Sequence, residues 1–213
     1  MSQPPGPRRR GRPPARQSEQ TEAEILRAAR VCFSKRGYAR TSVAQIAREA
    51  GVTSRAVYHY VDSKPELFVR AALAAHLRVA GEIRAQLEGG RDARDTLGRW
   101  IRAFLALFDE DPSVVQFLSL VVVEAERNPE LAEALPREDL GISAVNRWLV
   151  DRAVAYGELA PGVDPAGAVT LLEVFGAGLT LLAHDERKHD YRAMLDVLGR
   201  LIEGTLFTRS PPS

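Results

Sequence analysis

Cysteine and long apolar runs are scarce in this sequence, and each scarcity excludes classes of protein. Cys32 is the only cysteine among the 213 residues, so neither an intrachain disulfide nor a cysteine-rich zinc site can form. It lies on an apolar helical stripe, and we interpret it as a core residue rather than a reactive thiol. The longest apolar run, residues 168–183, contains Glu173 and falls short of the roughly 20 apolar residues that span a bilayer. With no apolar segment after the basic N-terminus, we expect no signal peptide, no membrane association and a cytoplasmic protein.

Strand patterns and the motifs of enzymes are also missing. Apolar residues recur at helical spacing from Thr21 to about residue 206, without period-2 alternation, so we predict an all-α fold of about nine helices. The chain has no nucleophile elbow, phosphate-binding loop or pair of catalytic acids. His184 and His189 stand beside aspartates without a metal-ligand spacing, and we interpret them as part of a solvated joint. We therefore expect no enzymatic activity, no cofactor and no metal.

Charge is distributed unevenly along the chain. Residues 1–64 contain 13 Lys or Arg against 5 Asp or Glu, a net charge of +8. The remainder contains 16 against 23, a net charge of −7. This asymmetry predicts that only the front of the molecule faces a polyanion such as duplex DNA.

Composition and helix breaks divide the chain into four segments. We predict a disordered basic arm at 1–18, a helix-turn-helix domain at 19–66, a helical domain at 67–207 and a tail at 208–213. The first helix is expected to begin at Thr21, because Thr21 and Glu24 fit a capping box.

The predicted arm carries a signal of its own. Residues 1–18 include five prolines and five arginines, a composition that cannot bury enough apolar surface to order itself. Arg10 and Arg12 flank a glycine in an Arg-Gly-Arg-Pro sequence like that of AT-hooks. The arm is therefore either a reader of narrow A·T minor grooves or a nonspecific electrostatic tail.

Two short helices joined at Gly51 form the predicted helix-turn-helix. In this motif the N-terminal residues of the second helix meet base edges in the major groove. The chain places two hydroxyl groups and an arginine there: Thr53, Ser54 and Arg55. Flanking polar groups are suited to the phosphate backbone, which positions a protein without specifying sequence: Thr41, Ser42, Tyr58 and Lys64. Alternatives stay open, since Arg55 can hold a phosphate, Tyr58 can pack in the core, and Lys64 can be a solvated charge.

The segment TSVAQIAREAGVTSRAVYHYVDSKPELF resembles the TetR (tetracycline-repressor) family of bacterial regulators, and the resemblance covers residues 21–68. It rests on the Ala47 and Gly51 spacing, the Tyr58-x-Tyr60 pair and the Ser63-Lys64 step. The resemblance implies phosphate contacts from Ser42, Tyr58 and Lys64. It implies base contacts from Thr53, Ser54 and Arg55, with help from His59. Two positions depart from the family pattern: Arg55 stands where many members have a small residue, and Val61 where many have phenylalanine.

The same resemblance implies that residues 67–207 bind a small inducer and pair with a second subunit. The helices expected at about 165–183 and 190–206 are rich in apolar residues, which fits a four-helix homodimer interface or burial within one subunit. No cluster of charge suggests a polar ligand, so an apolar or aromatic one is expected. Aromatic residues are the candidate pocket walls, with plain core as the alternative: Trp100, Phe104, Phe108, Phe117, Trp148, Tyr156 and Phe175.

Two functions fit these features. The first is a repressor that a small molecule releases from a palindromic operator. The second is an architectural DNA-binding protein without an effector. They differ in the ratio of affinities for an operator and for random DNA.

Overall fold

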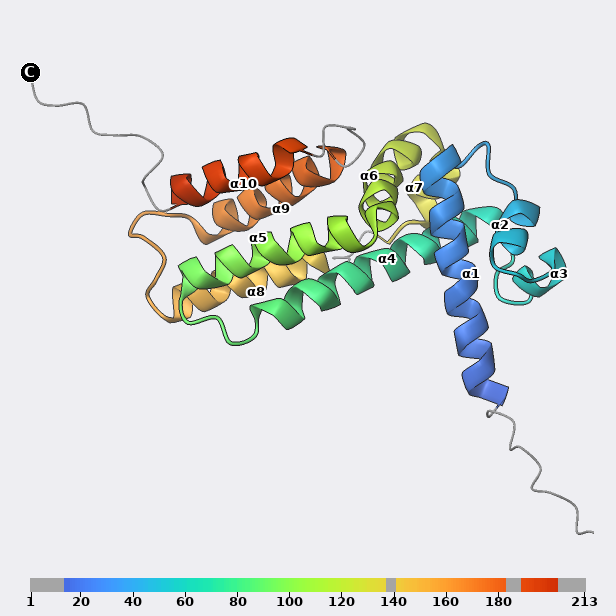
Figure 1. The fold of residues 1–213 in the computed structure, drawn as a ribbon, viewed down its shortest axis with the longest axis horizontal. Coiled ribbons are helices and arrows are strands. Elements are labelled where there is room, and N and C mark those ends of the chain that lie inside the picture. The colour runs from blue at the N-terminus through green and yellow to red at the C-terminus, as the bar shows by residue number, and fades with distance from the viewer. Residues whose placement is uncertain (1–13, 137–140, 183–188, 203–213) are drawn as a thin grey trace, which may run out of the picture.

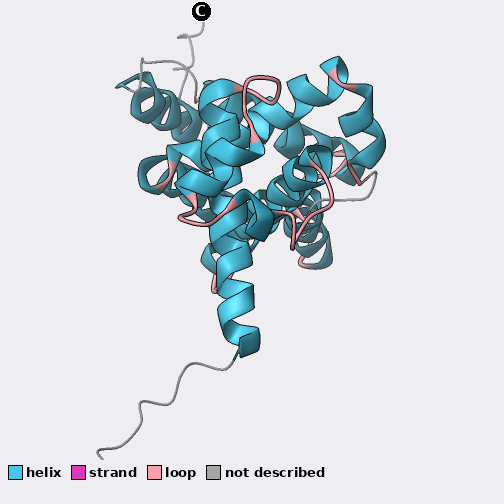
Figure 2. Ribbon diagram, turned by 90° about the vertical axis from the view of Figure 1, so that its right-hand side faces the viewer, coloured by secondary structure: helices cyan, strands magenta, loops and turns pink. Residues whose placement is uncertain are grey.

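The computed structural model describes residues 14–136, 141–182 and 189–202, and every regular element within these ranges is an α-helix (Figures 1 and 2). The all-α prediction is confirmed, with ten helices in the described residues where about nine were expected. We call α1–α3 the head and α4–α10 the body. The helices are α1 Pro14–Arg36, α2 Val43–Glu49, α3 Ser54–Val57, α4 Lys64–Leu87, α5 Ala93–Glu110, α6 Pro112–Arg127, α7 Pro129–Ala134, α8 Ile142–Ala155, α9 Pro165–Leu182 and α10 His189–Ile202.

The first helix starts earlier than predicted. It begins at Pro14, not Thr21, and Figure 1 shows its N-terminal half extending beyond the other helices. Proline suits the first position of a helix because its missing N–H has no partner there, and the residues that follow are mostly good helix formers. The predicted arm is therefore corrected: residues 14–18 are helical. Ser18 Oγ and Tyr60 OH lie 3.2 Å apart in a hydrogen bond that joins this helix to the end of the head.

Local capping defines the two short helices of the head. Ser42 caps α2 through a reciprocal pair: its hydroxyl accepts from Gln45 N–H at 3.3 Å, and Gln45 Oε1 accepts from Ser42 N–H at 2.9 Å. Gly51 then turns the chain at φ +69°, the left-handed region that favours glycine. Thr53 caps α3, which is only four residues long.

The head is joined to the body through a shared aromatic core. Phe33 on α1, Phe68 on α4 and Phe117 on α6 are fully buried, with ring centroids 5.0 to 6.1 Å apart. Helix α4 leads from this junction into the body, where it packs against α5 and α8, and α9 packs on α8 and α6 (Figure 1). The head therefore cannot move as a unit without disturbing α6. None of the described helices is both long and apolar enough to cross a membrane.

Candidate nucleic-acid interface

Helix α3 has one buried side and one exposed side. Val57 is fully buried and anchors the helix on the head, whereas Thr53 and Arg55 are exposed and Ser54 is half-buried. The Thr53 hydroxyl accepts from Ala56 N–H at 3.2 Å, which fixes the start of the helix. The three predicted base-reading residues are thus brought together at the N-terminal end of one rigidly seated helix.

Of the two residues predicted to hold phosphate before α2, the structure offers only one. Ser42 is exposed at the N-cap of α2. Thr41 is only 2% exposed, and its hydroxyl lies within hydrogen-bond distance of the carbonyl oxygens of Gly37 at 2.8 Å and Cys32 at 3.2 Å. The predicted phosphate contact of Thr41 is corrected for this reason: its side chain ties α1 to the start of α2.

A groove of about 590 Å³ runs between α1 and α3. Tyr58 is 51% exposed at its edge, and His59 is exposed with its ring edge-on to Tyr60 at 5.4 Å. Tyr60 is half-buried and is held by Ser18, so it is a packing residue of the head. The groove shows that α1 and α3 present polar groups on one side; its lining residues are Thr21, Thr53, Arg55, Ala56, Tyr58, His59 and Tyr60.

Lys64 is a cation held against an aromatic ring. Its Nζ lies 4.2 Å from the centroid of the Tyr38 ring, and the side chain is half-buried at the start of α4. Burial lowers the pKa of Lys64, while the nearby carboxylates of Glu130 and Glu124 act to raise it. Burial also raises the pKa of Tyr38, whose hydroxyl donates to Glu130 Oε1 at 2.9 Å. The position of Lys64 is therefore set by contacts within the protein.

Two buried charges at the junction were missed by reasoning from the sequence. Glu124 on α6 is 7% exposed and accepts from Tyr38 N–H at 2.9 Å. Arg30 on α1 is 5% exposed and pairs with both carboxylate oxygens of Asp111, at 2.7 and 3.1 Å. Arg30 and Glu124 each interrupt an apolar stripe of a helix in the sequence, and this pattern could have indicated that they are buried.

The predicted pocket aromatics do not form one group. Trp100 is stacked on Phe104 at 5.7 Å and tilted against Phe175 at 6.1 Å, and its Nε1–H donates to the buried Asn146 Oδ1 at 2.9 Å. Phe117 belongs instead to the junction core. Of the rest, Trp148 is half-buried beneath two arginines and Tyr156 is 71% exposed, while the side chain of Phe108 lies outside the described residues. Only Trp100, Phe104 and Phe175 remain together as candidate pocket walls.

A separate apolar groove of about 450 Å³ lies between α4, α6 and α7. His76 on α4 reaches it, with Nδ1 2.9 Å from the Ala72 carbonyl oxygen. Burial lowers the pKa of His76, although the hydrogen bond to Ala72 acts to raise it. The remaining walls are Val121, Val122, Ala125, Glu126, Ala132, Leu135 and Pro136.

Arg10, Arg12, His184 and residues 203–213 lie outside the described residues. In the described part, no three His, Cys, Asp or Glu side chains gather as a metal site would need. What the described head offers is a capped, solvent-facing α3 beside a groove that Arg55 and His59 help to line, joined to a large helical body. This arrangement defines a helix-turn-helix DNA-binding protein with a second, helical domain.

Comparison with known proteins agrees with this class. Residues 25–71 match the family model described as bacterial regulatory proteins, tetR family, and residues 87–186 match that of a tetracyclin repressor-like C-terminal domain. The transcriptional regulator TtgR of Pseudomonas putida is 36% identical over 169 residues, which cover 76% of this chain and 80% of TtgR. The regulator UidR of Escherichia coli K12 is 24% identical, covering 73% and 78% of the two chains. The structure of Salmonella enterica GusR superposes with a TM-score of 0.69 at 28% identity, covering 88% and 95%.

The chain therefore belongs to the TetR family of bacterial transcriptional regulators. It is a DNA-binding regulator of transcription, and its membership of this non-enzymatic family confirms the prediction that it is not an enzyme. Ser42, Thr53, Ser54, Arg55, Tyr58, His59 and Lys64 stay predicted DNA contacts.

Proposed function

We propose that the protein is a homodimeric repressor that binds a palindromic operator and is released by a small apolar or aromatic effector. This proposal rests on one observation: the exposed helix α3 is joined to a helical body that leaves large apolar side chains exposed to solvent. A single α3 covers one half-site, so specific binding to a palindrome requires two copies about one helical turn of DNA, roughly 34 Å, apart.

Helices α9 and α10 supply the proposed dimer interface. Each has a face packed on the core, with Leu179 2% exposed on α9 and Leu198 partly buried on α10. Their other faces expose large apolar side chains: Leu171 67%, Val174 64%, Val197 47% and Leu201 54%. Because soluble proteins rarely leave such residues grouped in water, we expect a second copy to cover them under two-fold symmetry.

The effector is proposed to bind within the body beside Trp100. Asn146 is fully buried, and its Nδ2 donor has no hydrogen-bond partner in the described structure. An unpaired buried donor is costly, so a ligand oxygen that accepted a hydrogen bond from Asn146 Nδ2 would be stabilising. Trp100, Phe104 and Phe175 would supply the apolar contacts.

Release follows if the effector binds better to a conformation with a different spacing of the two α3 helices. The effector then lowers operator affinity in proportion to its preference for that conformation. The Phe33, Phe68 and Phe117 core gives a continuous packed route from the body to the head.

The dimer is tested by matched substitutions of two equally exposed valines. Val174→Glu on α9 should shift the protein to monomer in sedimentation equilibrium and weaken operator binding. Val122→Glu is the control, because Val122 on α6 is also 64% exposed but lies outside the proposed interface. A dimer that survived Val174→Glu and Leu171→Glu together would contradict the interface.

Operator recognition is tested with the palindrome that flanks the gene. Its affinity at physiological salt should exceed that for random DNA by at least about a thousandfold, and an effector found by screening should reduce it. An affinity ratio near one would favour the architectural alternative. Asn146→Leu should abolish the response to the effector without changing DNA binding in its absence.

A further inference from the structure

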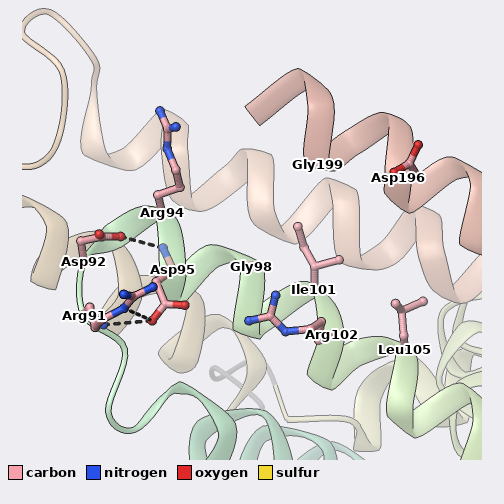
Figure 3. A pocket seen from close by; sticks show the side chains of 10 residues that line it. All are labelled: Arg91, Asp92, Arg94, Asp95, Gly98, Ile101, Arg102, Leu105, Asp196 and Gly199. Atoms are coloured by element: carbon pink, nitrogen blue, oxygen red, sulfur yellow. Dashed lines mark hydrogen bonds and ion pairs between the residues drawn. The ribbon is translucent and has the colours of Figure 1, made fainter. Parts of the chain in front are cut away.

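A groove beside α5 combines apolar side chains with three arginines and three aspartates. It lies between α5 and α10 and has a volume of about 450 Å³, within the range of small-molecule sites (Figure 3). Ile101 and Leu105 form its apolar floor, and Asp196 and Gly199 face it from α10. Arg94 and Arg102 are exposed at its edge.

The acidic side chains of the groove are already engaged. Asp92 caps α5 by accepting from Asp95 N–H at 2.7 Å. Asp95 accepts from Arg91 N–H at 3.1 Å and Arg99 Nε at 3.2 Å. On α10, Asp196 pairs with Arg200 at 3.0 Å. Asp95 and Asp196 are therefore paired with arginines, while Asp92 is held by its capping hydrogen bond at the start of α5.

Arg94 and Arg102 differ from those acids, because in the described structure neither has a hydrogen bond or ion pair. Gly98 lies midway between them, four residues from each. A Cβ at Gly98 would be 3.3 Å from Nη1 of Arg102, so the missing side chain lets this guanidinium lie along α5 beside Gly98 (Figure 3). The two arginines are about 12 Å apart along the helix axis and about 80° apart around it. In Figure 3 their guanidinium groups point in different directions, but both side chains are exposed and can turn toward one anion.

We propose that this groove binds an organic anion with an apolar body, such as a carboxylate on an aliphatic chain. The carboxylate is held by Arg102 and Arg94, and the chain lies over Ile101 and Leu105. The site is distinct from the effector site proposed beside Trp100. It also avoids the proposed dimer face, since Asp196 and Gly199 lie three residues apart on a side of α10 away from Val197 and Leu201.

The test is calorimetric titration of the full chain with octanoate and, as the uncharged counterpart, with 1-octanol. Wild-type protein should bind octanoate and bind octanol at least tenfold more weakly. Arg102→Gln, which removes the charge from an exposed side chain, should weaken octanoate binding about tenfold or more and leave octanol binding unchanged. Arg127→Gln, exposed on α6 and absent from the groove, is the control.

A second variant tests whether octanoate binds in this groove and not elsewhere on the protein. Gly199→Leu fills the groove from α10, and nothing lies within 4 Å of a Cβ placed there, so the fold should tolerate it. It should abolish octanoate binding while operator affinity stays at the wild-type value. The proposal is overturned if wild-type protein does not bind octanoate at millimolar concentration. It is equally overturned if Arg102→Gln and Gly199→Leu bind octanoate as tightly as wild type, or if octanol binds as well as octanoate.

Discussion

The backbone N–H of Tyr38 donates to Oε1 of Glu124 at 2.9 Å, across 86 positions of sequence. Oε2 of the same carboxylate accepts from Asn128 Nδ2 at 2.9 Å. Tyr38 follows α1 and Glu124 lies on α6, so one buried carboxylate joins the turn that leads into α2 to the body. A movement of α6 must therefore either carry this turn along or break the bond.

Substitution of Glu124 should separate its hydrogen bond from its charge. Glu124→Ala leaves Tyr38 N–H buried without an acceptor and should lower the free energy of unfolding by about 1–3 kcal/mol. Glu124→Gln keeps an acceptor and should cost less. Urea denaturation measures both, and equal losses in the two variants would contradict the role given to the hydrogen bond.

Asp111 forms a second contact between head and body, through its ion pair with Arg30 of α1. Burial tends to raise its pKa, but hydrogen bonds from Arg30, Ser113 and Arg78 hold the pKa well below its ordinary value. Asp111→Ala leaves the buried Arg30 with the Ser113 hydroxyl but without a carboxylate, and should destabilise the fold by about 3 kcal/mol. The exposed neighbour Glu110→Ala is the control and should change stability little.

The depressed pKa of Asp111 also predicts an acid dependence. Its contribution to stability is complete above the unfolded pKa of about 3.9 and is lost as the pH falls toward the folded value. Below pH 4, wild-type protein should therefore lose stability faster than Asp111→Asn. Thermal unfolding between pH 5 and 2.5 measures the difference, and parallel curves for the two proteins would count against it.

Substitution of Arg55 should best distinguish recognition of bases from contact with the phosphate backbone. If Arg55 reads guanine, Arg55→Ala should weaken operator binding by about 1–3 kcal/mol and relax preference at one base pair in each half-site. Fluorescence anisotropy against a set of single-base operator variants measures both effects. Uniform weakening on all sequences would show a phosphate contact instead.

The lowered pKa of His76 predicts that the stability of the fold decreases at mildly acidic pH. Because burial lowers its folded pKa, the unfolded chain takes up the proton first as the pH falls below the unfolded value of about 6.5. Stability is therefore full above pH 6.5 and should decrease between that value and the folded pKa. His76→Gln should remove this part of the profile; Glu126 is the acidic residue on the facing wall of the groove.

The helix-turn-helix could be predicted because its determinants are local. The caps at Ser42 and Thr53 and the turn at Gly51 each involve residues no more than five apart. Local rules were ambiguous at two points. Thr41 and Ser42 both carry a hydroxyl that can cap a helix; the structure shows Ser42 capping α2 with Gln45, while the Thr41 hydroxyl bonds back to Gly37. At α1, the Thr21 and Glu24 pattern imitated a helix start inside a longer helix.

The buried charges could not be predicted in the same way. Arg30 and Asp111 are 81 residues apart, and Tyr38 and Glu124 are 86 apart, so each partner is supplied by the fold alone. The aromatic residues of the body posed a similar problem. Sequence shows that Trp100 and Phe117 are apolar, but only packing decides that one lies beside Asn146 and the other at the junction.

Because α1 begins at Pro14, the segment before it is attached to the first turn of an anchored helix. The helix is anchored by fully buried Ile25 and Phe33 and by the bond from Ser18 to Tyr60, so its first turn has a set direction relative to α3. One residue inserted between Pro14 and Ser18 would rotate whatever precedes it by about 100° around the helix axis. DNA affinity should then oscillate with insertion length, returning after about seven residues, two full turns of α1. If the basic segment were attached by a flexible linker instead, DNA affinity would not oscillate with insertion length.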